Sequence, residues 1–126
     1  MLRRDFILVQ IEELGKAIAR LFENRNNGVV HKNEGQTEVI YTSLRIEKDF
    51  IFSHTADEIR VALDYEDKAG LQRMELVAKT LVEESYLYES GTYLQKAKEI
   101  FLYLQQHDNT FSIERVSLLE DIEKRL

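Results

Sequence analysis

The stretch "YLYESGTYLQKAKEIFLYLQQHDNT", residues 86–110, places a Ser-Gly-Thr break between two tyrosine-rich amphipathic runs. Glycine readily adopts the left-handed conformation that ends helices, so a long helix that begins near Ala69 should stop at the serine just before Gly91. Thr92 and Gln95 have the spacing of a capping box, which predicts the start of a second helix. We therefore expect two helices that fold back on each other across a very short turn.

The N-terminal segment is predicted to form another long helix, from about Arg4 to Phe22. Its apolar residues recur at spacings of three and four, as on one face of an amphipathic helix. Gly15 lies inside this pattern, and a glycine in mid-helix costs ~1 kcal/mol relative to alanine. We interpret it as a sign that a neighbouring helix approaches closely.

The rest of the chain also has helical patterns. Residues 23–35 are rich in asparagine and glycine and are expected to form a mobile loop, after which a short helix covers residues 36–44. Residues 45–54 fit either one helical turn or an extended connection. Thr55 and Glu58 form a capping box for a helix to about Asp64, and Ser112 is placed to cap a last helix. No segment shows the alternation of a half-buried strand.

Composition limits the classes of function. With 126 residues, 44% apolar and 32% charged, the chain fits a single helical domain, residues 1–126. It has no cysteine, which excludes thiolate chemistry, disulfides and iron–sulfur clusters. The net charge is −6 and the densest basic cluster is only Arg3 with Arg4, which argues against nucleic-acid binding. No run approaches the ~20 apolar residues of a membrane span, so we expect a cytoplasmic protein without a membrane partner.

The helical hairpin resembles a tetratricopeptide repeat, in which a small residue allows two helices to approach and aromatic residues fill the remaining gap. Four positions agree with that pattern, namely Ser85, Tyr88, Ala97 and Phe101. Four depart from it: Leu81 stands at the tryptophan position, Glu84 at a leucine position, Asn109 at the proline position, and Gly91 one residue before the usual turn glycine. The resemblance covers about a quarter of the chain, and it implies stacked helical hairpins.

The order "MLRRDFILVQIEELGKAIARL" at the N-terminus, combined with this C-terminal half, also resembles an uncharacterised family of small bacterial helical proteins of unknown function. That resemblance implies an all-helical fold and carries over no catalytic residue. The fold class expected is therefore all-α, a bundle of about six helices with tetratricopeptide-like stacking of hairpins.

Candidate catalytic and metal sites are weak. His54 with Asp57 and Glu58 is the best local set for a metal, but acidic residues at a helix start are also favoured by the helix dipole. The carboxylate clusters at residues 64–67 and at Glu83, Glu84 and Glu89 are interpreted as solvated faces. No phosphate loop, nucleophile elbow or dinucleotide fingerprint is present, so we expect no cofactor and no enzymatic activity.

The leading hypothesis is a protein-interaction module, a scaffold or adaptor for a protein or peptide partner. Its partner-binding face would be the outer side of the first hairpin helix, formed by Lys79, Val82, Tyr86 and Glu89. A small metal- or metabolite-binding protein or enzyme that uses His54 and nearby carboxylates is the alternative. A third hypothesis is a structural subunit that assembles with itself, for example as a homodimer through an exposed helix face.

Overall fold

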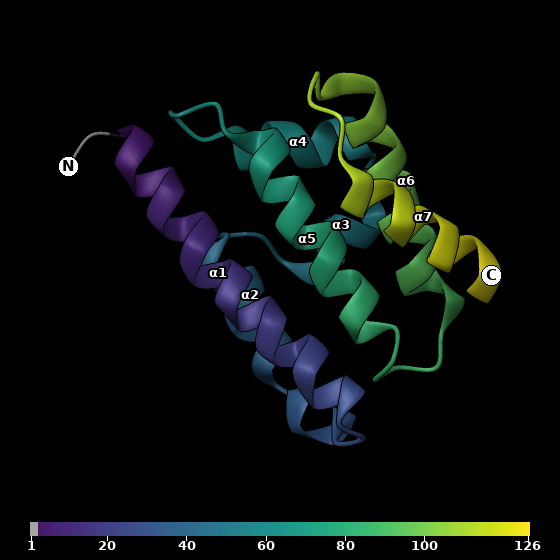
Figure 1. Cartoon of the computed structure of the whole chain (residues 1–126). Coiled ribbons are helices and arrows are strands. Elements are labelled where there is room, and N and C mark those ends of the chain that lie inside the picture. The colour runs from purple at the N-terminus through teal and green to yellow at the C-terminus, as the bar shows by residue number, and fades with distance from the viewer. Residues whose placement is uncertain (1–2) are drawn as a thin grey trace.

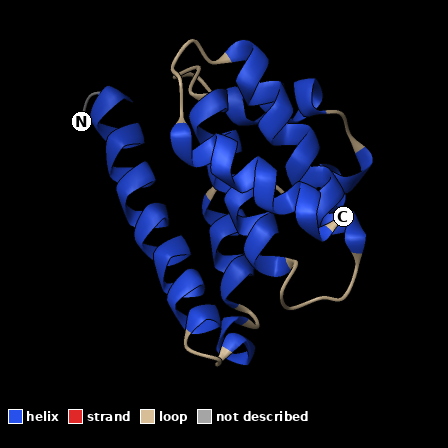
Figure 2. Cartoon of the chain, turned by 45° about the vertical axis from the view of Figure 1, so that its right-hand side comes forward, coloured by secondary structure: helices blue, strands red, loops and turns tan. Residues whose placement is uncertain are grey.

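The computed structural model describes residues 3–126, with side chains from Phe6 onward, so the side chains of Arg3 and Arg4 lie outside the described part. Seven α-helices and one 3-10 helix follow each other without a strand in this part of the chain (Figure 2). They are α1 (Arg3–Asn26), η1 (Val30–Asn33), α2 (Gln36–Ser43), α3 (Lys48–Ser53), α4 (Ala56–Asp64), α5 (Gly70–Glu84), α6 (Gly91–His107) and α7 (Ile113–Arg125). The expected all-α bundle is confirmed. None of these helices combines the length and the apolar character needed to cross a bilayer.

Helix α5 is the centre of the bundle. It contacts α1, α2, α4 and α6, and Figure 1 shows it between α1 on one side and α6 with α7 on the other. Its apolar residues recur around most of the helix, and Met74, Val77, Ala78 and Leu81 are fully buried. A helix that is apolar on several faces is stable only when neighbours cover those faces. The fold is therefore built around this helix.

The pairing of α5 with α6 confirms that the chain folds back between the two amphipathic runs. The residues placed at the small and aromatic positions of α6, Ala97 and Phe101, are both fully buried in the core. Tyr88, which was expected on the first helix, lies instead in the connection and stacks on Tyr93 with ring centroids 5.3 Å apart.

The turn between these helices differs from the prediction. Helix α5 ends at Glu84 rather than Ser90, and the chain continues in a turn in which Tyr86 and Leu87 donate to the carbonyls three residues back, at 3.2 and 2.9 Å. Ser90 then caps α6, and its Oγ accepts from the Thr92 amide at 3.3 Å. The predicted capping box at Thr92 is therefore wrong.

Gly91 does not terminate a helix in the left-handed conformation. It is the first residue of α6, and the glycines with positive φ in the described chain are Gly28 and Gly35. A serine that can cap a helix stands directly before Gly91, and a side-chain oxygen at this position satisfies an otherwise free amide of the first turn. The six-residue connection is thus longer than the very short turn expected.

Two other segments are more ordered than the sequence patterns indicate. Helix α1 continues to Asn26, and η1 occupies part of the expected loop; within it the buried Asn33 donates to the Leu21 carbonyl at 2.9 Å and accepts from Asn24 at 2.8 Å. The ambiguous residues 45–54 contain the short helix α3. The capping box of Thr55 with Glu58 and the cap at Ser112 are confirmed.

The close approach expected at Gly15 is absent. A Cβ added there would meet no atom within 4 Å. The crowded glycine is Gly70, where an added Cβ would lie against Asp64 Oδ1 and 2.6 Å from the Arg60 carbonyl oxygen. Helix α5 therefore starts in direct contact with the end of α4, whereas the face of α1 around Gly15 is left open.

Candidate interaction groove between α1, α5 and α7

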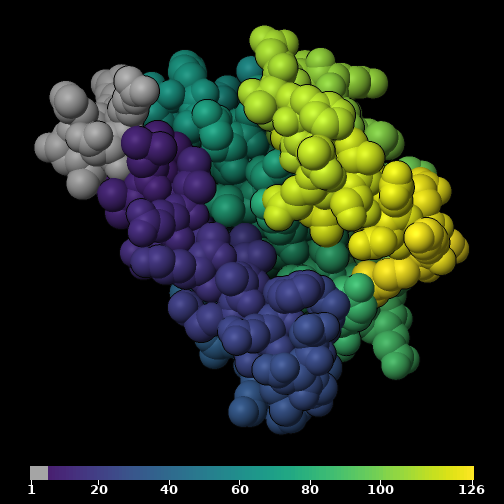
Figure 3. Space-filling model, viewed as in Figure 1, coloured from purple at the N-terminus to yellow at the C-terminus, as the bar shows by residue number. Residues whose placement is uncertain are grey.

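One narrow stripe of the central helix is not covered by its neighbours. Between Gly70 and Glu84 the side chains that remain partly or fully exposed are Leu71, Gln72, Glu75 and Lys79. Their spacing of three and four residues places them on a single face. On this face α1 and α7 flank α5, and Figure 3 shows α1 in purple and α7 in yellow with the surface of α5 between them.

The stripe is the floor of a groove. Two adjoining hollows of about 450 Å³ and 370 Å³ share Ile11, Leu76 and Lys79, so they form one continuous depression. The floor extends from Leu71 to Glu83, roughly 18 Å at 1.5 Å per residue, or about three helical turns. This is the length of surface that a short helix can cover.

The larger hollow is mainly apolar. From α1 it is lined by Ile11, Gly15, Ile18, Ala19 and Phe22, from α5 by Leu76 and Val82, and from α7 by Leu118. Phe22 keeps 50% of its surface exposed. Because no atom fills the space next to Gly15, the wall formed by α1 is shallow at its centre. The groove thus presents apolar surface to solvent with room for a partner to approach the backbone of α1.

Ion pairs border this apolar surface. Lys79 Nζ lies 2.5 Å from Glu114, and Arg115 lies 3.1 Å from Glu75 and 2.9 Å from Asp108. Burial alone would lower the pKa of Arg115, but its hydrogen bonds to both carboxylates outweigh this effect and raise it. The pairs with Glu75 and Lys79 connect the floor on α5 to the wall on α7, and the pair with Asp108 connects α7 to the end of α6.

The groove includes two of the four residues predicted to bind a partner. Lys79 and Val82 both line it. Tyr86 lies beyond the end of α5, 38% exposed, with its ring between the guanidinium groups of Arg25 at 4.1 Å and Arg125 at 3.8 Å. Glu89 lies exposed on the connection to α6. Because α5 ends at Glu84, Tyr86 and Glu89 do not continue the helical face that contains Lys79.

The opposite side of α5 holds a buried polar cluster that the sequence analysis missed. Glu84 is completely buried; it accepts hydrogen bonds from Thr37 Oγ1 at 3.0 Å, from Lys48 Nζ at 2.8 Å and from the Tyr41 hydroxyl. Glu83, which lines the groove side of the helix, is also buried and forms a two-point ion pair with Arg25 of α1, at 2.9 and 3.1 Å. The interpretation of these two acids as a solvated face is therefore wrong.

Burial and charge raise two pKa values in this cluster. Burial raises the pKa of Tyr41, and the neighbouring Glu84 carboxylate raises it further. Burial would lower the pKa of Lys48, but its hydrogen bond to Glu84 and the charge of Glu84 outweigh that effect and raise it. Lys48 also lies over the rings of Tyr88 at 5.0 Å and Tyr93 at 5.4 Å. Glu84 therefore has its hydrogen-bond partners within the chain, and they join the end of α5 to α2 and α3.

A second buried cation lies at the far end of α5. Arg73 is fully buried and donates to Asp67 at 2.7 and 2.5 Å and to the Leu63 carbonyl at 2.9 Å. The Tyr65 ring lies 4.0 Å from its guanidinium group, while the buried Tyr65 hydroxyl has no hydrogen-bond partner among the described residues. This cluster ties the connection between α4 and α5 to the helix that follows it.

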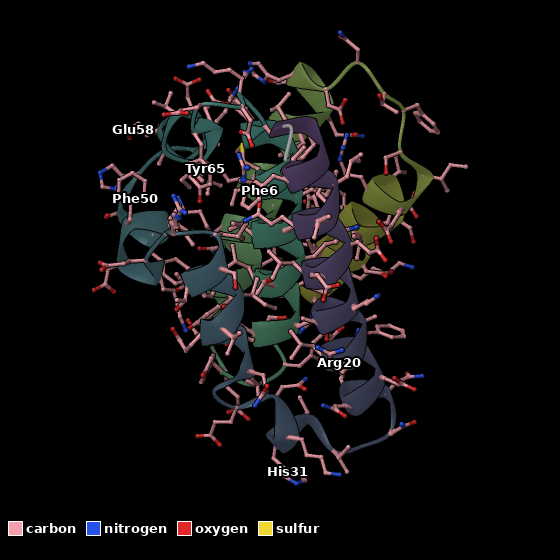
Figure 4. The ribbon with its side chains drawn as sticks, turned by 90° about the vertical axis from the view of Figure 1, so that its left-hand side faces the viewer. Phe6, Arg20, His31, Phe50, Glu58 and Tyr65 are labelled. Carbon is pink, nitrogen blue, oxygen red and sulfur yellow. The ribbon has the colours of Figure 1, made fainter. Side chains whose placement is uncertain are left out.

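The candidate metal set takes part in local structure instead. His54 stacks on Phe50 with ring centroids 3.7 Å apart, and its Nδ1 lies 2.9 Å from the Phe50 carbonyl oxygen. Glu58 is engaged in its capping box. Figure 4 shows Glu58 and Phe50 at the opposite end of the molecule from His31. Among the described residues no three histidine or acidic side chains gather in a way that could hold a metal ion.

Comparison with models of known protein families, with curated proteins and with solved structures gives no match for this chain. The interpretation of the site accordingly depends on its geometry.

Proposed function

We propose that the protein is a protein-interaction module whose partner binds in the groove between α1, α5 and α7. The observation that carries the proposal is the apolar lining of this groove, which remains open to solvent above the most buried helix of the fold. Apolar grooves of this length bind amphipathic helices, whose residues at i, i+3, i+4 and i+7 insert between the walls. Lys79 and Val82 belong to the proposed surface, and Tyr86 with Arg25 borders its end.

The tetratricopeptide-like hairpin forms part of this proposal. Helices α5 and α6 would act as one stacked unit, and the flanking helices α1 and α7 would form the walls that repeat scaffolds use to enclose a partner. On this proposal the four departures from the repeat pattern reflect the packing of this one hairpin against its own neighbouring helices. Glu84, for example, stands at a leucine position because it accepts from residues of α2 and α3.

The test is partner capture with a groove variant and a matched control. Gly15 lines the larger hollow, and none of the described atoms lies within 4 Å of a Cβ added there, so the side chain of Gly15→Trp would project into the groove. Arg20→Trp adds the same bulk at an exposed position of α1 that does not line the groove. We expect partners bound by the wild type to be lost from Gly15→Trp and kept by Arg20→Trp. Equal capture by all three proteins would contradict the proposal.

Self-assembly is the second candidate, and exposed apolar side chains favour it. Phe6, Leu8 and Val9 on α1 remain largely uncovered in the single chain. Light scattering over a range of concentrations distinguishes the two functions, because a homodimer formed on this face would dissociate on dilution and would be weakened by Leu8→Ser.

A further inference from the structure

We infer that the groove is adapted to a basic amphipathic helix, one with an apolar stripe of about three turns flanked by lysine or arginine side chains. The inference rests on the proposed function and specifies the chemistry of the partner. Three features of the groove support it: the distribution of its charges, the space beside Gly15, and the charge of the whole chain.

Carboxylates outnumber cationic groups along the groove. Its two hollows are lined by the acidic residues Glu75, Glu83, Asp108 and Glu114 and by the basic residues Lys79 and Arg115. Each carboxylate is already in an ion pair, yet a paired carboxylate retains free lone pairs that can accept from a second donor. An incoming helix therefore meets an excess of acceptors.

The members of these ion pairs differ in exposure. In the pair of Lys79 with Glu114, the Glu114 side chain is 66% exposed and the Lys79 side chain only 26%. In the pair of Arg115 with Asp108, the Asp108 side chain is 30% exposed and the Arg115 side chain only 4%. The pair of Arg25 with Glu83 is reversed, with the carboxylate more buried. In the pair of Arg115 with Glu75 the carboxylate is again the more exposed member, at 21% against 4%. Three of the four bordering pairs thus present their negative end to solvent. Lysine or arginine beside the apolar stripe of a partner would be attracted there.

Space beside α1 matches a helix rather than an extended segment. Gly15 and Ala19 are one turn apart on the wall of the groove, and small residues at this spacing let the backbones of two helices approach. The apolar side chains of Ile11 and Phe22 stand on either side of that gap. A helix crossing at Gly15 would pack against both of them.

The net charge favours a basic partner over a second copy of this chain. Two copies would each contribute a formal charge of −6 and would repel at long range. A basic partner would be attracted at long range and would bind more weakly in salt, because the exposed carboxylates are screened at separations beyond about 10 Å at 0.1 M ionic strength.

The experiment uses two model peptides of 15 residues, identical in their leucine stripe and differing in whether lysine or glutamate fills the other positions. Fluorescence anisotropy of each labelled peptide with the full-length protein gives its affinity. We expect the lysine peptide to bind about tenfold or more tightly than the glutamate peptide at low salt, and the difference to shrink at high salt. Glu114→Lys should reduce the preference for lysine, whereas Glu34→Lys, an exposed site outside the groove, should not.

Each outcome separates this inference from the proposed function. If both peptides bind equally and Gly15→Trp abolishes both, the groove binds helices but the inferred basic character is wrong. If binding is unaffected by Gly15→Trp, both proposals fail. If the lysine peptide does not bind, the inference is overturned, and capture of partners with Gly15→Trp and Arg20→Trp still decides the function.

Discussion

The two sides of helix α5 use charged residues in opposite ways. Toward α2 and α3, Glu84 is fully buried and bound by Lys48 and Tyr41, so its charge is compensated entirely inside the protein. Toward the groove, Glu75 and Lys79 stay partly exposed and form ion pairs with α7. Removing one partner of a buried pair leaves an uncompensated charge, whereas a pair with an exposed member, such as Lys79 with Glu114, contributes little to stability. One side of the helix is thus closed by buried polar contacts, whereas the other is partly open to solvent.

The largest expected effect is on the closed side. Glu84→Ala removes the buried acceptor of Lys48, Tyr41 and Thr37 and leaves Lys48 only its ion pair with the exposed Glu38, so the free energy of unfolding should fall by about 3–5 kcal/mol. Urea denaturation followed by circular dichroism measures this loss.

Glu89→Ala is the matched control for that change, because it removes an exposed glutamate from the adjoining connection. Its effect should stay within about 0.5 kcal/mol. Similar losses of unfolding free energy in Glu84→Ala and Glu89→Ala would show that the buried Glu84 contributes no more stability than an exposed glutamate.

Alkaline pH should weaken the same cluster. The pKa values of Tyr41 and Lys48 are both raised in the folded protein, so folding stabilises their protonated forms. This stability is fully present below the unfolded-state pKa values of about 10 and is lost as the pH rises through the folded values. Urea midpoints should therefore show no loss from this cause up to about pH 10 and should fall above it, and Tyr41→Phe should make the fall shallower. If Tyr41→Phe leaves the dependence of the urea midpoint on pH unchanged, titration of Tyr41 is excluded as a cause of the fall.

The next largest loss of stability is expected at the contact between α4 and α5. Gly70→Ala places a methyl group against the Arg60 carbonyl, a backbone atom that cannot rotate away, and against Asp64. Overpacking of this kind costs about 1–3 kcal/mol. Thermal unfolding would show a lower midpoint for this variant, and a midpoint equal to that of the wild type would mean that the two helices separate easily.

Local patterns in the sequence were sufficient to predict most helices. The capping box at Thr55 depends on residues three apart, and the core positions Ala97 and Phe101 follow from spacing within one helix. Glu84 was misread because its partners Thr37 and Lys48 lie far away in the chain, so its burial is a property of the tertiary structure. One signal was available: Glu84 follows Leu81 by three residues, which places it on the core face.

The candidate site was less accessible to prediction than the fold. Lys79 and Val82 were identified from the outer face of one helix, but the groove exists because α1 and α7, from opposite ends of the chain, flank that face. The choice of Tyr86 and Glu89 assumed a helix that continued to Ser90. In the structure Ser85 is the C-cap of α5 and Ser90 is the N-cap of α6.

The smallest effect on stability is expected at Gly15, where the substitution should stabilise the protein rather than destabilise it. Gly15→Ala meets no atom within 4 Å, and alanine is favoured over glycine in mid-helix by about 1 kcal/mol, so the variant should be more stable than the wild type. As a control, Gly28→Ala should be destabilising, because Gly28 has a φ of +78°. If Gly15→Ala raises the melting temperature and also weakens binding of the lysine peptide, the glycine lowers the stability of the protein but leaves space for a partner. A gain in stability with unchanged affinity would mean that no partner backbone approaches α1 there.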